Sequence, residues 1–185
     1  MIIIITGVSG VGKTTIGKLL SETIGWTFYE GDDYHTNVNL AKMRNGTPLT
    51  DDDRWPWLDA LRTKLSEIVL HEENAILSCS ALKESYRTRL GSGLKDIVFV
   101  YLRGDYQLVR NRISERVGHF MSADLLAQQY SDLEEPQNAI VVDASNNGIG
   151  RTMPTRKLEG FVQSANKQAS QCEGQKYMPL WHIGK

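Results

Sequence analysis

The sequence has 185 residues, enough for one domain with a buried core, and its 21 Lys and Arg residues nearly balance its 22 Asp and Glu residues. The net charge of −1 argues against nucleic acid or an anionic membrane surface as the main partner, and no apolar run is long enough to span a membrane. Because Cys79 and Cys172 are too few for a disulfide framework and the first residues lack a signal-peptide pattern, we expect a soluble cytoplasmic protein.

A glycine-rich segment directly follows the first apolar run. Residues 2–6 are typical of a buried parallel strand, and residues 7–14 fit the pattern G-x-x-x-x-G-K-[ST], in which backbone N–H groups surround the phosphates of a nucleotide. Apolar residues then recur at helical spacing as far as Ile24, so a helix N-terminus adds partial positive charge. Lys13 is expected to reach the β- and γ-phosphates, and Thr14 to offer its hydroxyl to Mg²⁺. An ordinary glycine-rich turn would not need the lysine, the hydroxyl and both flanking elements together.

A second strand is predicted over residues 26–29, where β-branched and aromatic side chains follow Gly25, a residue suited to end the preceding helix. Its carboxyl end carries Asp32, Asp33 and His35. Ligands bind at this edge of an open parallel sheet, so we favour a substrate or metal site over the alternative, a solvated acidic loop.

Two helices are predicted next, over residues 37–44 and after Thr50. Thr50 and Asp53 have the spacing of a capping box, with Asp in place of Glu or Gln, so some acids of this stretch cap a helix. Arg54 falls in the first turn, where a positive charge opposes the helix dipole. This unfavourable position indicates a role outside the helix.

The third predicted strand, residues 75–79, leads at once into another helix. Cys79 is expected to be a small core residue and not a reactive thiol. Lys83 and Arg87 are four residues apart, so both could project from one helix face toward the carboxyl edge of the sheet. The same spacing fits an ordinary solvated face equally well.

A long apolar run over residues 97–102 predicts a central strand covered on both faces, and Asp105 is placed to cap the helix after it. A glycine-containing break at residues 117–121 separates that helix from a short one over residues 122–130. Arginines directly before such a break suit a lid that closes over a transferring phosphoryl group, although a basic helix surface is the simpler alternative. These arginines are Arg110, Arg112 and Arg116.

A fifth strand is predicted over residues 139–142, followed by a long loop and a helix that begins near Pro154. The apolar tail, residues 174–185, could dock on its own domain or on a second subunit. Five strand candidates that alternate with helices predict a parallel α/β sheet, in one domain over residues 1–185.

Several of these motifs, in this order, resemble the small P-loop gluconate kinases. The likeness runs from residue 3 to residue 143 and is carried by motifs within residues 7–13, 31–35, 42–58, 79–87 and 118–136. The phosphate-binding loop alone fits many proteins, whereas the combination is specific. The resemblance implies a P-loop NTPase-type three-layer α/β/α fold with a parallel, roughly five-stranded sheet and a helical lid at about residues 116–136.

The resemblance also implies an activity, the transfer of the γ-phosphoryl group of ATP to the 6-hydroxyl of D-gluconate, with ATP and Mg²⁺ as cofactors. Thr14 is then the metal ligand. The residues expected to bind the nucleotide are Gly7, Val8, Ser9, Gly10, Val11, Gly12, Lys13, Thr14, Thr15 and Arg112.

An acceptor site follows from the same resemblance. Cations suit the gluconate carboxylate, and acids and a histidine suit its hydroxyls. Either Asp32 or Asp33 orients the attacking hydroxyl; related shikimate kinases place an aspartate at the corresponding strand end, which favours Asp32. Lys13 and Arg116 would stabilise the transferring group. The expected substrate residues are Asp32, Asp33, His35, Arg54, Lys83, Arg87 and His119, the last of which could instead pack within the lid.

Two parts of the predicted site have no clear motif: the second Mg²⁺ ligand and the adenine contacts. The strand at residues 75–79 has no terminal aspartate for Mg²⁺, which leaves Glu30 and Asp32 as candidates, and the chain after Asp143 departs from the family, so adenine contacts are unassigned. The alternatives are a kinase of another small hydroxy acid such as shikimate, a nucleoside monophosphate kinase, and a nucleotide-binding sensor without significant turnover. A homodimer fits the family likeness and the apolar tail.

Overall fold

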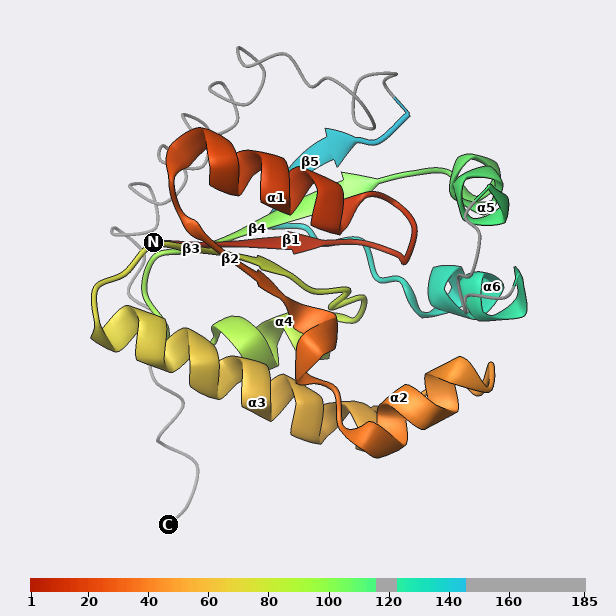
Figure 1. The fold of residues 1–185 in the computed structure, drawn as a ribbon, viewed down its shortest axis with the longest axis horizontal. Coiled ribbons are helices and arrows are strands. Elements are labelled where there is room, and N and C mark those ends of the chain that lie inside the picture. Colours follow the sequence, from red (N-terminus) through yellow and green to blue (C-terminus); the bar gives the residue numbers. More distant parts are fainter. Residues whose placement is uncertain (116–122, 146–185) are drawn as a thin grey trace.

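The computed structural model describes residues 1–115 and 123–145, which form a parallel sheet with helices on both of its faces (Figure 1). Its strands are β1 (Ile2–Thr6), β2 (Thr27–Glu30), β3 (Ala75–Ser78), β4 (Ile97–Arg103) and β5 (Ile140–Asp143). Its helices are α1 (Lys13–Ile24), the short 3₁₀ helix η1 (Gly31–Tyr34), α2 (Asn37–Arg44), α3 (Asp51–Leu70), α4 (Glu84–Gly91), α5 (Tyr106–Ser114) and α6 (Ala123–Asp132).

Within these residues the strand order is β2-β3-β1-β4-β5, and every neighbouring pair is parallel. The central strand β1 pairs Ile4 with Leu77 of β3 on one side and with Phe99 of β4 on the other. The predicted five-stranded parallel sheet is therefore confirmed. All carboxyl ends of the strands lie along one edge, where ligands bind in such sheets.

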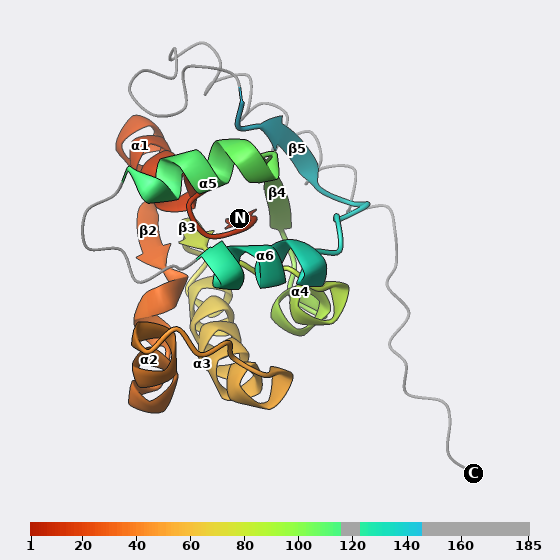
Figure 2. The ribbon, with the colours of Figure 1, turned by 90° about the vertical axis from the view of Figure 1, so that its right-hand side faces the viewer.

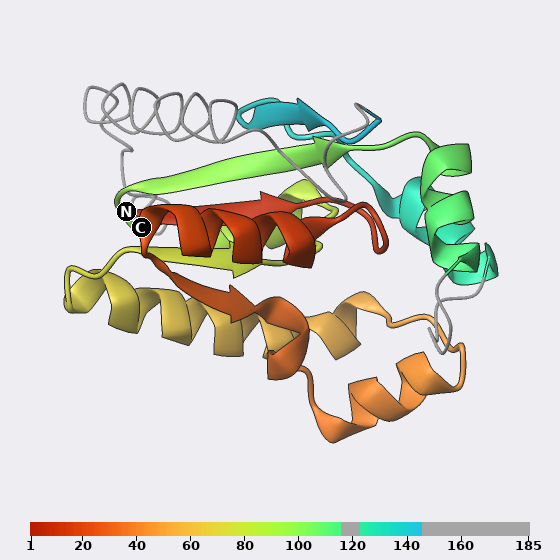
Figure 3. The same cartoon turned by 45° about the horizontal axis from the view of Figure 1, so that its top comes forward.

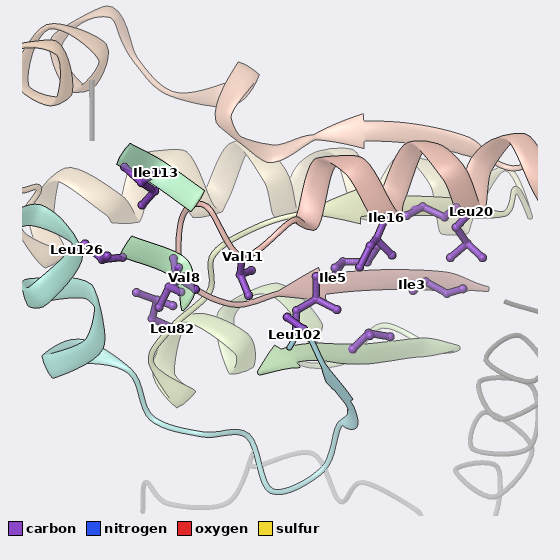
Figure 4. Close-up of a cluster of buried hydrophobic side chains, with 14 of the residues drawn as sticks. Ile3, Ile5, Val8, Val11, Ile16, Leu20, Leu82, Leu102, Ile113 and Leu126 are labelled. Carbon is purple, nitrogen blue, oxygen red and sulfur yellow. The ribbon is translucent and has the colours of Figure 1, made fainter. Parts of the chain in front are cut away.

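Four consecutive isoleucines explain why both faces of β1 are covered. All four are fully buried. Alternate side chains of a strand point to opposite faces, so burial of all four requires that both faces of the sheet are covered. Ile3 and Ile5 pack with residues of α1, as Figure 4 shows, whereas Ile2 and Ile4 pack with residues of α3 and α4 on the other face. This arrangement gives the three layers that the sequence predicts.

Helices α5 and α6 stand at the carboxyl end of the sheet, one above the other when that end faces the viewer (Figure 2). Figure 3 shows both beyond the tip of the loop that joins β1 to α1. Ile113 of α5 and Leu126 of α6 belong to the same apolar cluster as Val8 of that loop. The rings of Tyr106 and Tyr130 meet edge to face, with centroids 5.4 Å apart, and join the two helices.

The predicted helix boundaries rest on local chemistry that the structure confirms. Gly25 ends α1 in the left-handed conformation, with φ of 72°. Thr50 and Asp53 form a full capping box at α3, and Asp105 accepts a hydrogen bond from the backbone N–H of Leu108 at 2.8 Å.

Several sequence predictions concern residues outside the described ranges: Arg116, His119, the lid hinge at 117–121, Cys172, the helix near Pro154 and the tail at 174–185. Cys79, which is described, is buried as expected, and burial raises the pKa of its thiol to about 12. In the described ranges, no helix combines the length and the apolar character needed to cross a membrane.

Candidate active site

The loop of residues 7–14, called the phosphate loop below, leaves the carboxyl end of β1 and turns into α1. Gly7, Gly10 and Gly12 have φ values of 138°, 82° and 117°, which side chains strongly disfavour. A Cβ at Gly7 would lie 2.8 Å from the carbonyl oxygen of Leu102, and one at Gly10 would lie 2.6 Å from a carbon of Ile113. The glycines are therefore required by conformation and by space.

Lys13 is the first residue of α1, and its ammonium folds back over the loop to donate to the carbonyl oxygen of Val8 at 3.1 Å. The loop therefore holds a cation beside the partial positive charge of the helix N-terminus. Thr14 and Thr15 are exposed at the start of the helix. This arrangement is suited to a polyphosphate.

Glu30, at the end of β2, is joined to the phosphate loop by a hydrogen bond from the Thr14 hydroxyl to its carboxylate, 2.6 Å long. A hydroxyl and a carboxylate are hard oxygen donors, of the kind that Mg²⁺ prefers. The pair therefore fits a magnesium ion, which would supply positive charge beside the nucleotide phosphates. No cluster of three or more His, Cys, Asp or Glu side chains suited to a metal occurs in residues 1–115 and 123–145.

A cleft opens between the phosphate loop, η1, the start of α3 and α6, with about 680 Å³ of space when open solvent is included. Five of the residues expected from the sequence line it together: Ser9, Lys13, Asp32, His35 and Arg54. They come from three separate elements, so the fold brings them into one site.

His35 is buried within this cleft and held by stacking. Its ring lies 4.3 Å from the ring of Trp57, at an interplanar angle of 14°. Burial, and secondarily the charge of Arg54, lowers the pKa of His35 to about 4, so its ring is neutral at physiological pH.

The two neighbouring aspartates of η1 differ in position. Asp32 lines the cleft with a side chain that is 63% exposed, and its carboxylate lies 4.0 Å from Nε2 of His35. Asp33 is also exposed, yet it is not among the described residues that line the cleft. The geometry therefore favours Asp32 as the acid that meets a substrate.

Arg54 belongs to a polar cluster at the wall of the cleft. Asp51 accepts hydrogen bonds from the Lys83 ammonium at 2.8 and 3.1 Å and from the Tyr86 hydroxyl. These bonds lower the pKa of Asp51, and the same pairing raises the pKa of Lys83. The Arg54 guanidinium donates to the Tyr86 hydroxyl at 3.4 Å and lies 3.9 Å from Asp51. Lys83 thus reaches the cleft wall through Asp51, whereas Arg54 itself lines the cleft.

Arg87 is almost fully buried beside the β3–α4 connection. Its guanidinium donates to the carbonyl oxygens of Ala81 and Leu82 at 3.0 and 2.8 Å and to the carboxylate of Glu84. It orders this turn, and it is not among the described residues that the structure brings to the cleft.

Arg112 links three segments around the phosphate loop. Its guanidinium donates to the carbonyl oxygen of Val11 at 3.1 Å and to that of Ala144, beyond β5, at 2.8 Å. In this position Arg112 supports the loop from the side of α5. The structure does not describe Arg116 and His119, the other two residues expected in the lid.

Helix α6 contributes residues that the sequence did not single out. Gln129 accepts a hydrogen bond from the backbone N–H of Ser9 at 2.7 Å and donates to the Ser9 hydroxyl at 3.1 Å. The adjacent Gln128 also lines the cleft. Uncharged amides do not appear in a charge pattern, so the sequence analysis passed over them. The signal that could have found them is that Gln128 and Gln129 form a polar pair next to the apolar stripe of Leu125, Leu126 and Tyr130.

Comparison with known proteins places the chain in a family. A family model described as an AAA domain matches residues 3–122. A probable gluconokinase of Xenopus tropicalis is 43% identical over 155 residues, which cover 74% of this chain and 80% of that protein. The thermosensitive gluconokinase of Escherichia coli (strain K12) is 41% identical over 134 residues, which cover 72% of each chain.

Solved structures agree with these relatives. A gluconokinase from Sinorhizobium meliloti 1021 is 37% identical with a TM-score of 0.72, and the match covers 92% of this chain and 91% of that one. A sugar kinase from Janibacter sp. HTCC2649 is 36% identical with a TM-score of 0.77, over 92% of this chain and 96% of that one. The resemblance seen in the sequence is confirmed, and the chain belongs to the gluconokinase family of P-loop kinases.

Proposed function

We propose that this protein is a gluconokinase that transfers the γ-phosphoryl group of ATP to the 6-hydroxyl of D-gluconate, giving 6-phosphogluconate and ADP. The observation that carries the proposal is the meeting of Lys13 with Asp32, His35 and Arg54 in one cleft. A phosphate-binding lysine suits ATP, an arginine suits a carboxylate, and an acid with a neutral histidine suits hydroxyls, so the cleft offers groups for both substrates of a polyol-acid kinase. The relatives named gluconokinase support this substrate.

On the donor side, the phosphate loop binds the nucleotide. Its backbone N–H groups and the α1 N-terminus face the phosphates, and Lys13 moves from the Val8 carbonyl oxygen to the γ-phosphoryl group. Thr14, with Glu30 beside it, would hold Mg²⁺, which would neutralise phosphate charge when bound.

On the acceptor side, Arg54 binds the gluconate carboxylate, since a guanidinium can form two parallel hydrogen bonds with it. Asp32 accepts the proton of the attacking hydroxyl, and His35 supplies a further polar contact. The phosphoryl group passes through a loose transition state, so positioning and charge matter more than the strength of the base.

Residues of the lid and of the cleft wall complete the proposed site. Arg116 is the lid cation that stabilises the transferring group, Arg112 holds the phosphate loop in place, and His119 contacts the substrate. Lys83 supports Arg54 through their shared partner Asp51. A cytoplasmic homodimer is the expected state, which size-exclusion chromatography with light scattering would test.

A panel of sugar acids and small hydroxy acids tests the proposed substrate in a coupled assay for ADP release. Gluconate is expected to stimulate ADP release strongly, and shikimate and nucleoside monophosphates to leave it at background. If gluconate does not stimulate ADP release, the proposal is wrong. If shikimate alone stimulates it, the protein is a shikimate kinase instead.

A further inference from the structure

Asn39 is a buried polar residue next to the cleft. It lies in α2 and is only 2% exposed. Its side-chain nitrogen lies 2.7 Å from the backbone carbonyl oxygen of Asp53 and 3.4 Å from Nδ1 of His35. A buried amide in this position must satisfy its hydrogen bonds with these partners.

The Asp53 carbonyl decides which way the Asn39 amide faces. A carbonyl oxygen only accepts, so the atom that meets it at 2.7 Å is the amide nitrogen. That nitrogen carries a second hydrogen, which is directed to Nδ1 of His35. Nδ1 must then offer a lone pair, and in a neutral imidazole the single hydrogen sits on Nε2.

The surroundings of His35 agree with a neutral ring. The charged groups that face it are Asp32 from η1 and Arg54 from α3, and the stacked indole of Trp57 shields it from water. Nε2 points to the Asp32 side of the cleft, 4.0 Å from that carboxylate. Two heavy atoms at this separation can both bond to a single oxygen placed between them.

We propose that Asn39 is a positioning residue that fixes His35 in the tautomer with hydrogen on Nε2, so that His35 and Asp32 together bind one substrate hydroxyl. The hydroxyl oxygen accepts from Nε2–H, and its hydrogen points to the Asp32 carboxylate. A donor and an acceptor side by side discriminate a hydroxyl from a group that can only accept, such as a ketone oxygen. The identity of the substrate hydroxyl rests on the proposed function, whereas the tautomer does not.

Nitrogen NMR of protein labelled with ¹⁵N-histidine tests the tautomer directly. The chain has four histidines, and the His35 signals are assigned by their loss in His35→Gln. Near pH 7 the wild-type spectrum is expected to show a bare Nδ1 and a protonated Nε2. Hydrogen on Nδ1, or on both nitrogens, would overturn the proposal, whatever the enzyme phosphorylates.

Two variants separate positioning from simple structural support. Asn39→Ala is expected to give mixed His35 tautomers and about a tenfold fall in kcat/KM for gluconate, the effect of one lost hydrogen bond, with an unchanged KM for ATP. Lys42→Met is the control, because Lys42 also joins α2 to α3, through a 2.6 Å contact of its ammonium with the carboxylate of Asp53. It is expected to keep the tautomer and kcat/KM.

Equal losses of kcat/KM in both variants, or an unchanged tautomer in Asn39→Ala, would show that Asn39 only ties α2 to α3. Should Asn39→Ala fail to fold, the wild-type spectrum still decides the tautomer. An analogue that carries a carbonyl in place of the 6-hydroxyl cannot accept a phosphoryl group. Its binding is therefore measured as competitive inhibition against gluconate. Inhibition as strong as by a hydroxylated analogue would contradict the paired donor and acceptor.

Discussion

In the protein alone, the ammonium of Lys13 rests on the carbonyl oxygen of Val8, whereas the proposed reaction requires it at the γ-phosphoryl group. Lys13→Ala is expected to lower kcat by about 10²- to 10³-fold, the usual cost of removing one group that stabilises transition-state charge. Thermal unfolding, measured alongside coupled ADP release, should stay close to that of the wild type. Near-normal turnover would contradict the role of the phosphate loop.

In the proposed reaction, Arg54 is the cation that binds the carboxylate of the acceptor. Arg54→Ala is expected to raise the KM for gluconate about 10- to 100-fold, as the loss of a charge-assisted hydrogen bond predicts, without a change in the KM for ATP. Arg54→Lys is the matched control, since it keeps the charge and loses the two-pronged geometry, and an intermediate KM is expected. An unchanged KM in Arg54→Ala would rule out the contact with the carboxylate.

His35 makes stability depend on pH. Its pKa is about 4 in the folded protein and 6.5 when exposed, so the unfolded chain binds more protons between these values. Its contribution to stability is complete above pH 6.5 and is lost as the pH falls to about 4. Urea unfolding of the wild type and His35→Gln at a series of pH values checks this, and the variant should lose less stability across that window. Asp53, whose pKa is lowered to about 2 by Lys42, titrates below the window.

Individual site residues were predictable where a strand end fixed them. Asp32 and His35 follow β2, so the parallel sheet places them beside the phosphate loop. Arg87 was different, because its distance from Lys83 along the helix does not show that its guanidinium turns inward to backbone carbonyl oxygens. The link from Asn39 to His35 depends on how α2 packs, which no local pattern specifies.

Helix α6, like α5, meets the phosphate loop directly. Gln129 accepts a hydrogen bond from the backbone N–H of Ser9, within the loop whose N–H groups surround phosphate in this motif. A nucleotide that uses this N–H must first displace Gln129. The contact therefore couples the position of α6 to occupation of the loop.

Removing the Gln129 amide should favour the nucleotide. Gln129→Ala is expected to lower the Kd of ATP several-fold, in line with a competing hydrogen bond worth roughly 1 kcal/mol, as isothermal titration calorimetry would measure. Gln128→Ala is the matched control on the same helix, because Gln128 donates to Asp132 and not to the loop. Weaker ATP binding in Gln129→Ala would instead indicate that the amide helps to hold the bound state.

At the scale of the whole molecule, the alternation of strands and helices along the sequence predicted the layers. The order of the strands within the sheet became clear only from the structure. Strand β1 pairs with β3 and β4, which are separated from it by whole helices. Periodicity identifies such strands but does not specify which ones become neighbours. The right-handed crossover rule reduces the possible orders without selecting one.

The core under β1 sets the stability of the domain. Leu61→Ala, at a fully buried position of α3, is expected to lower the free energy of unfolding by about 2 to 5 kcal/mol. Leu70→Ala at the end of the same helix is the control, because Leu70 is 79% exposed and its loss should change stability by less than about 0.5 kcal/mol. Equal urea unfolding midpoints for Leu61→Ala and Leu70→Ala would contradict the described packing of α3 against the sheet.

The central place of β1 also has a consequence during synthesis. Ile2 pairs with Ala75 and Ile97, and ribosomes add roughly 5 to 20 residues per second, so the strand waits several seconds for both neighbours. During that interval four adjacent isoleucines, a segment of high β-propensity without charge, remain without the neighbours that later bury them. The residues that anchor the finished sheet are thus also an aggregation hazard while the chain is being made.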